Sequence, residues 1–224
     1  MRILITGAAG GVGSTLVSGM KDRYEIRGLD RLPMPELEDT IIGDVADFDT
    51  MLEATKGMDA VIHLTGVDHE WEGVLQSNII GTYNMLETVR LNGVKRIAYA
   101  SRAGVLGPYP ETVKRTVDIP TLPRGFYTVS KVFGEAIGYS YASQYDMGFV
   151  AVRIGNFNRN RPLPEHPHHL SHADAVRVFE RAIIHPDVKF EIVFGVSDSN
   201  WPRYDLDHGR LAIGYYPQDR YEHK

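Results

Sequence analysis

Residues 2–13 read Arg2-Ile-Leu-Ile-Thr-Gly7-Ala-Ala-Gly-Gly-Val-Gly13, and this stretch decides the fold of the chain. Its short apolar run, rich in β-branched residues, predicts a buried strand, and the glycines predict a tight turn directly after it. A helical pattern follows over 14–20, and a second strand pattern over 24–29 ends at Asp30. Strand, Gly-x-x-Gly-x-x-Gly turn, helix, strand and acid, in this order, are typical of a dinucleotide-binding βαβ unit.

Each part of this unit has a physical role in binding a dinucleotide. Gly7 permits the tight exit from the strand, Gly10 lets the backbone approach a pyrophosphate, and Gly13 lets the helix lie close to the sheet. Free N–H groups and a positive dipole at the helix N-terminus attract phosphate. Asp30 is expected to accept hydrogen bonds from the adenosine ribose. Its charge would repel a 2′-phosphate in spite of the neighbouring Arg31, so the sequence predicts NAD rather than NADP.

The composition of the chain limits the classes of protein to which it can belong. With 224 residues, of which 43% are hydrophobic, the chain can form one well-packed domain, which we expect to span 1–224. The formal net charge of -5 shows no basic excess and argues against a nucleic-acid partner. There is no cysteine, which excludes disulfides and thiolate chemistry and fits a reducing cytoplasm. The first strand starts the chain, and no apolar run approaches the roughly 20 residues that span a bilayer. We therefore expect a cytoplasmic protein with no signal peptide and no membrane segment.

Strand and helix patterns alternate along the whole chain, which predicts a parallel sheet with helices on both faces. Further strands are expected at 40–42, 59–65, 94–100, 148–154 and 190–194, and further helices at 48–56, 71–91, 126–145 and 171–184. The expected fold is therefore α/β, a Rossmann-like doubly wound sheet of about seven strands. Ligands should gather at the carboxyl ends of the strands. The segments 102–125, 156–170 and 195–224 are irregular or mostly polar, and we expect them to form a small appendage on the substrate side.

Tyr127 and Lys131 are four residues apart at the start of a predicted helix, so they share one of its faces. A phenol with a pKa of about 10 is a poor base at neutral pH, but a lysine ammonium and a nicotinamide cation beside it lower that pKa. Tyr127 can then exchange a proton with a substrate hydroxyl while hydride passes to or from the cofactor. The alternative is an exposed i,i+4 pair without function. The position of the pair after a dinucleotide-binding unit favours the catalytic interpretation.

Several motifs spread along the chain carry a family resemblance. They are Gly43-Asp-Val45, His63-Leu-Thr-Gly66, Asn78-Ile-Ile-Gly-Thr-Tyr-Asn84, Tyr127-Thr-Val-Ser-Lys131 and Arg153-Ile-Gly155, beside the glycine turn. With these motifs the chain resembles the extended short-chain dehydrogenase/reductases, specifically their NAD-dependent epimerase/dehydratase branch. Two late stretches, Phe194-Gly-Val-Ser-Asp198 and Gly214-Tyr-Tyr-Pro-Gln-Asp219, are similar to the C-terminal pattern of the uronate dehydrogenases within that branch.

The resemblance implies an NAD-dependent oxidoreductase that transfers hydride between NAD and a hydroxyl or hemiacetal carbon of a small sugar or sugar acid. It implies that Tyr127 is the base, that Lys131 lowers its pKa, and that Ser101 is the remaining hydroxyl donor. It also implies a homodimer formed through the two long helices that begin near Trp71 and Phe126. The residues that it places at the cofactor are Gly7, Gly10, Gly11, Val12, Gly13, Asp30, Arg31, Asp44, Val45, Leu64, Thr65, Gly66, Asn78, Tyr127, Lys131 and Ile154.

The substrate half of the site departs from the family pattern. Arg102 occupies the position of the second Ser/Thr, which normally holds the substrate hydroxyl. Ala103 and Gly104 follow it where uronate dehydrogenases have Asn and His, and Asp68 replaces an expected serine. The arginine that normally grips the carboxylate of the sugar acid has no counterpart in register. We therefore predict that Asp68, Arg102 and Asn156 contact the substrate, and that Arg102 holds a carboxylate.

Two other functions stay open from the sequence. An epimerase or dehydratase would retain its NAD through the cycle, whereas a dehydrogenase would accumulate NADH. A non-catalytic NAD-sensing protein would bind NAD without turnover, and the arginine at position 102 motivates this reading. The sequence also contains a run of histidines in one loop, but no acid or cysteine joins them at ligand spacing, so we predict no metal site. These histidines are His166, His168, His169 and His172.

Overall fold

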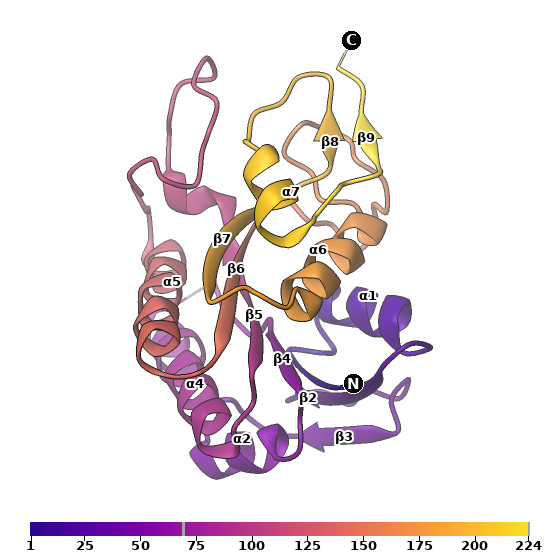
Figure 1. Ribbon diagram of the computed structural model, residues 1–224, viewed down its shortest axis with the longest axis vertical. Coiled ribbons are helices and arrows are strands. Elements are labelled where there is room, and N and C mark those ends of the chain that lie inside the picture. Colours follow the sequence, from indigo (N-terminus) through magenta and orange to yellow (C-terminus); the bar gives the residue numbers. More distant parts are fainter. Residues whose placement is uncertain (69, 224) are drawn as a thin grey trace.

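A seven-stranded parallel sheet forms the centre of the computed structural model, which describes residues 1–68 and 70–223 (Figure 1). Its strand order is β3-β2-β1-β4-β5-β6-β7, so the order reverses between β1 and β4, where doubly wound sheets bind ligands. The predicted Rossmann-like sheet is confirmed. The strands are β1 (Arg2–Thr6), β2 (Glu25–Asp30), β3 (Asp39–Ile42), β4 (Ala60–His63), β5 (Arg96–Arg102), β6 (Gly148–Ile154) and β7 (Phe190–Gly195).

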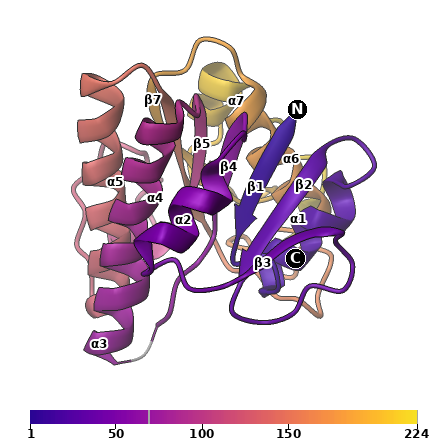
Figure 2. The ribbon, with the colours of Figure 1, turned by 90° about the horizontal axis from the view of Figure 1, so that it is seen from below.

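Helices cover both faces of this sheet (Figure 2). On one face lie α1 (Gly11–Met20) and α6 (His172–Ile184), and on the other lie α2 (Phe48–Thr55), α4 (Gly81–Asn92) and α5 (Phe126–Gln144). Alternation along β1 explains how one strand serves two cores, because successive side chains point to opposite faces. Ile3 and Ile5 pack with α1 and α6, whereas Leu4 packs with α2 and α4.

The helix predicted over 71–91 is divided into three parts. It starts as α3 (Trp71–Gly73), continues as the π-helical segment η1 (Val74–Ile80) and ends as α4. Gly93 terminates α4 in the left-handed conformation, with φ 69°, which glycine adopts readily at the end of a helix. Hydrophobic periodicity does not reveal such a π-helical segment, which is often found at functional sites. In this chain it carries the buried Asn78.

The mostly polar C-terminal segment, which was expected to form part of an appendage, contains three short elements. They are β8 (Asp198–Ser199), α7 (Asp207–Ile213) and β9 (Arg220–Tyr221), and Figure 1 shows them beyond the end of β7. Asp174, fully buried in α6, holds this segment in place. Its carboxylate accepts hydrogen bonds from Ser197 Oγ at 2.7 Å and from the backbone N–H of Gln218 at 2.9 Å. In the described part of the chain, no helix has the length and apolarity needed to cross a bilayer.

Candidate functional site

The glycine turn between β1 and α1 has the geometry that a pyrophosphate needs. Gly7 has a φ of +71°, and a Cβ on Gly13 would lie 2.1 Å from the carbonyl oxygen of Gly7. The turn can therefore be this tight only without side chains at these positions. Gly10 is the N-cap of α1 and makes no side-chain cap hydrogen bond. The first N–H groups of α1 thus remain available to an anion, which fits the predicted dinucleotide.

Asp30 ends β2 and faces the glycine turn. Its carboxylate accepts hydrogen bonds from the backbone N–H of Ala9 at 3.0 Å and of Leu32 at 3.1 Å, which orient it. Arg31 is exposed and forms an ion pair with Asp44, with 3.7 Å between Nη1 and Oδ2. A cavity of about 160 Å³ opens here. The predicted cofactor residues that line it are Gly7, Gly10, Asp30, Arg31, Asp44, Val45, Leu64, Thr65 and Gly66.

A second and larger cavity, of about 760 Å³, shares Leu64 with the first. It brings together the predicted catalytic and substrate residues with further members of the cofactor set, whereas the buried Gly13 and Asn78 line neither cavity. Those lining it are Gly11, Val12, Asp68, Ser101, Arg102, Tyr127, Lys131, Ile154 and Asn156. Two further residues line it, namely Phe157, which the sequence did not indicate, and Arg159, which is out of register with the carboxylate-binding arginine of the family. Their position directly after the end of β6 was the available signal.

Tyr127 and Lys131 lie on the first turns of α5, facing the end of β4. Lys131 is only 2% exposed, and its Nζ lies 5.4 Å from the ring centroid of Tyr127. A Cβ on Gly66 would lie 3.1 Å from that Nζ, so the glycine makes room for the ammonium group. Burial, together with the Arg102 guanidinium, lowers the pKa of Lys131 to about 8.

Arg102 lies beside Tyr127 in the larger cavity. Its Cζ is 5.3 Å from the Tyr127 ring centroid, and its Nη1 donates a long hydrogen bond of 3.4 Å to Thr128 Oγ1. The Arg102 guanidinium also lies close to Gly104, where a Cβ would be 2.6 Å from Arg102 Nε. Burial raises the pKa of Tyr127. The Arg102 guanidinium acts to lower this pKa, and the Asp68 carboxylate acts to raise it.

Ser101 takes part in a buried network behind the cavity. Its Oγ donates to Glu135 at 2.6 Å, and Glu135 accepts two hydrogen bonds of 2.9 Å from Arg153. Both charged side chains are almost completely buried. Sequence reasoning missed Glu135, although it lies four residues after Lys131 and so on the same helical face. The role of Ser101 as a hydroxyl donor to substrate stays a prediction.

Asn78 connects η1 to the chain after β4. Its Oδ1 accepts from the Val67 N–H at 2.9 Å, while its Nδ2 donates to the Val67 carbonyl at 3.0 Å and to Ser130 Oγ at 2.8 Å. Both amide hydrogens are thereby used within the protein. Asn78 fixes the segment that follows β4 against α5, and its contact with the cofactor stays a prediction.

The histidines of the 156–170 loop pack on one another. The ring centroid of His166 lies 5.2 Å from that of His169 and 6.0 Å from that of His168. His172 instead stacks on Phe157, with centroids 5.1 Å apart. Within residues 1–68 and 70–223, no group of three or more His, Asp or Glu side chains is arranged to hold a metal ion.

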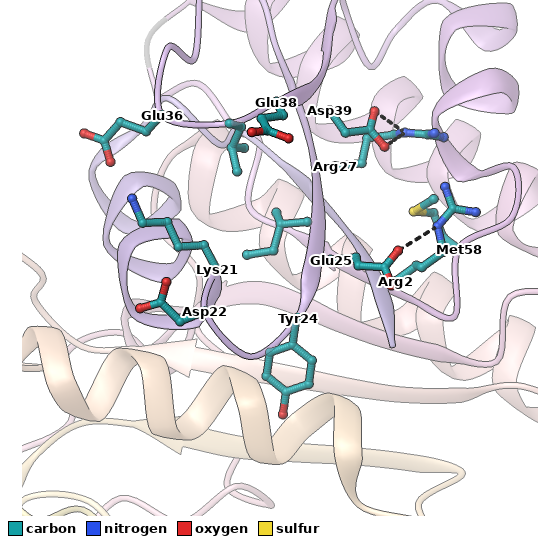
Figure 3. Close-up of a pocket in the computed structure, with 12 residues that line it drawn as sticks. Arg2, Lys21, Asp22, Tyr24, Glu25, Arg27, Glu36, Glu38, Asp39 and Met58 are labelled. Carbon is teal, nitrogen blue, oxygen red and sulfur yellow. Dashed lines mark hydrogen bonds and ion pairs between the residues drawn. The ribbon is translucent and has the colours of Figure 1, made fainter.

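Another pocket, of about 410 Å³, lies at the amino ends of β1 and β2 (Figure 3). Both of its arginines pair with carboxylates. Arg27 Nε lies 3.0 Å from Asp39, and Arg2 Nε lies 3.8 Å from Glu25, as the dashed lines in Figure 3 mark. This pocket is at the end of the sheet opposite the glycine turn, and its arginines have carboxylate partners. It adds nothing to the site described above.

Known proteins that are similar to this chain belong to the family that its motifs resemble. The model of the NAD dependent epimerase/dehydratase family matches residues 3–182. The NAD-dependent glucose-6-phosphate dehydrogenase of Haloferax volcanii is 36% identical, over 97% of this chain and 93% of that protein. The uronate dehydrogenase of Pseudomonas putida is 35% identical, over 99% of this chain and 85% of that protein. A variant of the uronate dehydrogenase from Agrobacterium tumefaciens, complexed with NAD, has a TM-score of 0.90 at 31% identity, with 98% of this chain and 85% of that chain covered.

Proposed function

The chain belongs to the NAD-dependent epimerase/dehydratase family, and from this premise we propose that it is an NAD-dependent oxidoreductase. Its reaction is hydride transfer between NAD and a hydroxyl or hemiacetal carbon of a small sugar or sugar acid. One observation carries the proposal. Tyr127 and Lys131 line the same cavity as Gly11 and Val12 of the dinucleotide turn, so a base lies beside the place for the cofactor. Dehydrogenases among its relatives favour this reaction over retention of NAD by an epimerase.

NAD, when bound, accepts the hydride. The residues of the chain hold the substrate and move its proton. Tyr127 takes the proton from the substrate hydroxyl at its phenolic oxygen. Arg102 and Lys131 are cations that lie 5.3 and 5.4 Å from the centroid of the Tyr127 ring, and the Arg102 guanidinium acts to lower the pKa of this phenol against the effect of burial. Asp30 would hold the adenosine ribose, and the N–H groups of α1 would hold the pyrophosphate.

An anionic substrate is favoured within this class. The two named relatives are dehydrogenases of a uronate and of glucose 6-phosphate, and both of these sugars carry an acid group. Arg102 lines the cavity where the substrate would lie. A guanidinium cannot act as a base near neutral pH, but it can bind an oxyanion through two parallel hydrogen bonds. We assign Arg102, Asp68 and Asn156 to substrate binding.

Two substitutions test the assignment. Tyr127→Phe should lower kcat by roughly 10²-fold or more, the loss typical of a missing general base, with NAD affinity by calorimetry nearly unchanged. Arg102→Ser should mainly raise KM for an anionic substrate, with a smaller loss of kcat. Tyr216→Phe, on an exposed tyrosine, is the matched control. If Tyr127→Phe retains full turnover, the dehydrogenase mechanism is wrong. If Arg102→Ser speeds the turnover of neutral sugars without weakening the binding of sugar acids, the arginine only obstructs the site.

We further propose a homodimer located in the cytoplasm. The outward faces of α3, α4 and α5 lie side by side in Figure 2 and expose several large hydrophobic side chains, which a second copy would cover. They are Trp71, Tyr83, Phe126, Val129 and Tyr139. The absence of cysteine supports a reducing compartment.

A further inference from the structure

The ammonium group of Lys131 lies against two phenol rings rather than against a carboxylate. Its Nζ is 5.1 Å from the ring centroid of Tyr99 and 5.4 Å from that of Tyr127, and the side chain is almost fully buried. Glu135 lies one turn further along α5, but its carboxylate bonds Arg153 instead. In the part of the chain that the structure describes, no carboxylate forms an ion pair with Lys131. The two rings are therefore the groups that face this buried charge.

A ring face holds a cation in a different way from a carboxylate. The π-electrons give the face a partial negative charge, and the attraction grows when the cation is removed from water, as Lys131 is. Because the ring has no formal charge, it can hold the ammonium without neutralising it. The positive charge then remains available to stabilise the phenolate of Tyr127, which an ammonium paired with a carboxylate would do more weakly.

Tyr99 belongs to a row of aromatic rings that crosses the sheet on the face under α5. In β5, Tyr99 stacks on His63 of β4, with centroids 6.0 Å apart and planes at 15°, and on Phe149 of β6, at 5.8 Å and 27°. Phe149 stacks in turn on Phe190 of β7, at 5.9 Å and 8°. Both Tyr99 and Phe149 are fully buried. The position of the Tyr99 ring is thus fixed from both sides.

Two glycines bring α5 close to this row. A Cβ on Gly134 would lie 2.6 Å from Tyr99 Cε1, and a Cβ on Gly138 would lie 2.7 Å from Phe149 Cε2. Both distances are too short for packed atoms, so α5 could not approach the rings this closely with side chains at these positions. Lys131 is three residues before Gly134 and so shares this face of the helix. The close packing therefore places the lysine beside Tyr99.

We propose that Tyr99 is a positioning residue for the reaction, whose ring face holds the Lys131 ammonium beside Tyr127. This rests on the proposed function, because Lys131 and Tyr127 are the catalytic pair of the dehydrogenase. Tyr99 is fully buried and lines neither of the two cavities, so it cannot touch substrate or cofactor. It can affect turnover only through other residues, and Lys131 is the catalytic residue that it contacts.

Kinetics at saturating NAD test the role of the ring, with whichever of glucuronate and glucose 6-phosphate the wild type oxidises. Tyr99→Leu should lower kcat by roughly 3- to 30-fold and leave the KM of the sugar nearly unchanged. Tyr99→Phe keeps the ring and should restore kcat to within about twofold of the wild type. Phe190→Leu removes a ring of the same row, two strands away from Tyr99, and should keep kcat.

The pKa of Lys131 gives a second measurement, which needs no turnover. A ring face favours the ammonium, so loss of the ring should lower this pKa below about 8. NMR titration of protein with isotopically labelled lysine follows it, and Lys131→Met assigns the signal. Arg102 and His63 also interact with this charge, and both stay in place in the variants. The pKa should fall by roughly 0.5 in Tyr99→Leu and stay constant in Tyr99→Phe and Phe190→Leu.

A fluorinated ring separates the charge of the ring face from the packing of the ring. Tyr99→pentafluorophenylalanine closely keeps the shape of Tyr99→Phe but removes the negative charge of the face. It should lower both kcat and the pKa of Lys131, and it keeps the test decisive if Tyr99→Leu does not fold. Values equal to those of Tyr99→Phe would overturn the proposal.

This proposal and the proposed function can fail independently. If the wild type forms no NADH with any sugar, the proposed function fails, while the pKa of Lys131 in the variants still decides whether Tyr99 holds its ammonium. If the wild type oxidises a sugar, but Tyr99→Leu and Phe190→Leu lose kcat equally and leave the pKa of Lys131 unchanged, the dehydrogenase stands. Tyr99 then has only a structural role.

Discussion

Lys131 is the residue whose chemistry depends most directly on burial. Its pKa is lowered from 10.5 to about 8 in the folded protein. Between these values the unfolded chain binds a proton that the folded chain does not, so the stability from this group rises with pH across this window. This contribution to stability is lost as the pH falls from 10.5 towards 8. Below pH 8 it no longer changes with pH. At neutral pH the protein carries this ammonium at a cost in stability, as active sites commonly do.

Lys131→Met should therefore stabilise the protein at pH 7 by up to ~3 kcal/mol and abolish NADH formation. Urea unfolding between pH 7 and pH 10.5 measures the effect, and the pH dependence should be weaker in the variant than in the wild type. Lys21→Met, on an exposed lysine, is the control and should keep the dependence. If the two variants show equal profiles, burial of Lys131 does not set its pKa.

Asp30 should decide which dinucleotide binds. Its carboxylate is held at the end of β2 by two backbone N–H groups and lines the smaller cavity. Arg31, which lines the same cavity, is paired with Asp44 and so is not directed at a 2′-phosphate. We expect NADP to bind at least ~10-fold more weakly than NAD, through charge repulsion and the loss of ribose hydrogen bonds. Calorimetric titration with both cofactors checks this, and equal or tighter NADP binding contradicts it.

At the scale of elements, the contact between α1 and the turn that follows β1 depends on one glycine. A Cβ on Gly13 would lie 2.1 Å from the Gly7 carbonyl oxygen and 2.7 Å from Ala8 Cα, both backbone atoms. Gly13→Ala must therefore displace the turn. We expect a loss of about 1–3 kcal/mol in stability and a large loss of NAD affinity.

Gly11→Ala is the matched control within the same helix. Its Cβ would meet Arg159 and Phe157 at an ordinary 3.7 Å, so the variant should keep its stability. Chemical denaturation compares the two variants, and calorimetry measures NAD binding to Gly13→Ala. Equal stability losses would show that the close approach at Gly13 does not matter.

The long helix after β4 contains a feature that apolar periodicity cannot predict. Its apolar positions predict one continuous helix over 71–91, and the two ends are nearly correct. The π-helical middle is not visible in the pattern, because it depends on a contact made elsewhere. Asn78 reaches Val67 and Ser130, which belong to other segments, and the segment η1 presents it to them.

For the whole molecule, the expected assembly is a dimer. The outward faces of α3, α4 and α5 expose hydrophobic side chains that a monomer would leave in water, including Tyr83 and Tyr139. Light scattering at micromolar concentration should give a dimer, and Tyr83→Glu should shift it towards monomer. Leu211→Glu, which changes an exposed leucine on α7, should have no effect. A monomeric wild type would contradict this prediction.

The sequence by itself determined the sheet, the glycine turn and the Tyr127–Lys131 pair. These follow from local periodicity, from glycines that a tight turn requires, and from i,i+4 spacing on one helix. Tertiary structure alone decided that Ser101 bonds to Glu135, and that Arg102 lies over Gly104 and Tyr127. It also decided that Arg115 lies over the ring of Tyr204. Such contacts join residues far apart in the chain, and their spacing in the sequence carries no periodic signal, because only the packing of strand ends and loops brings them together.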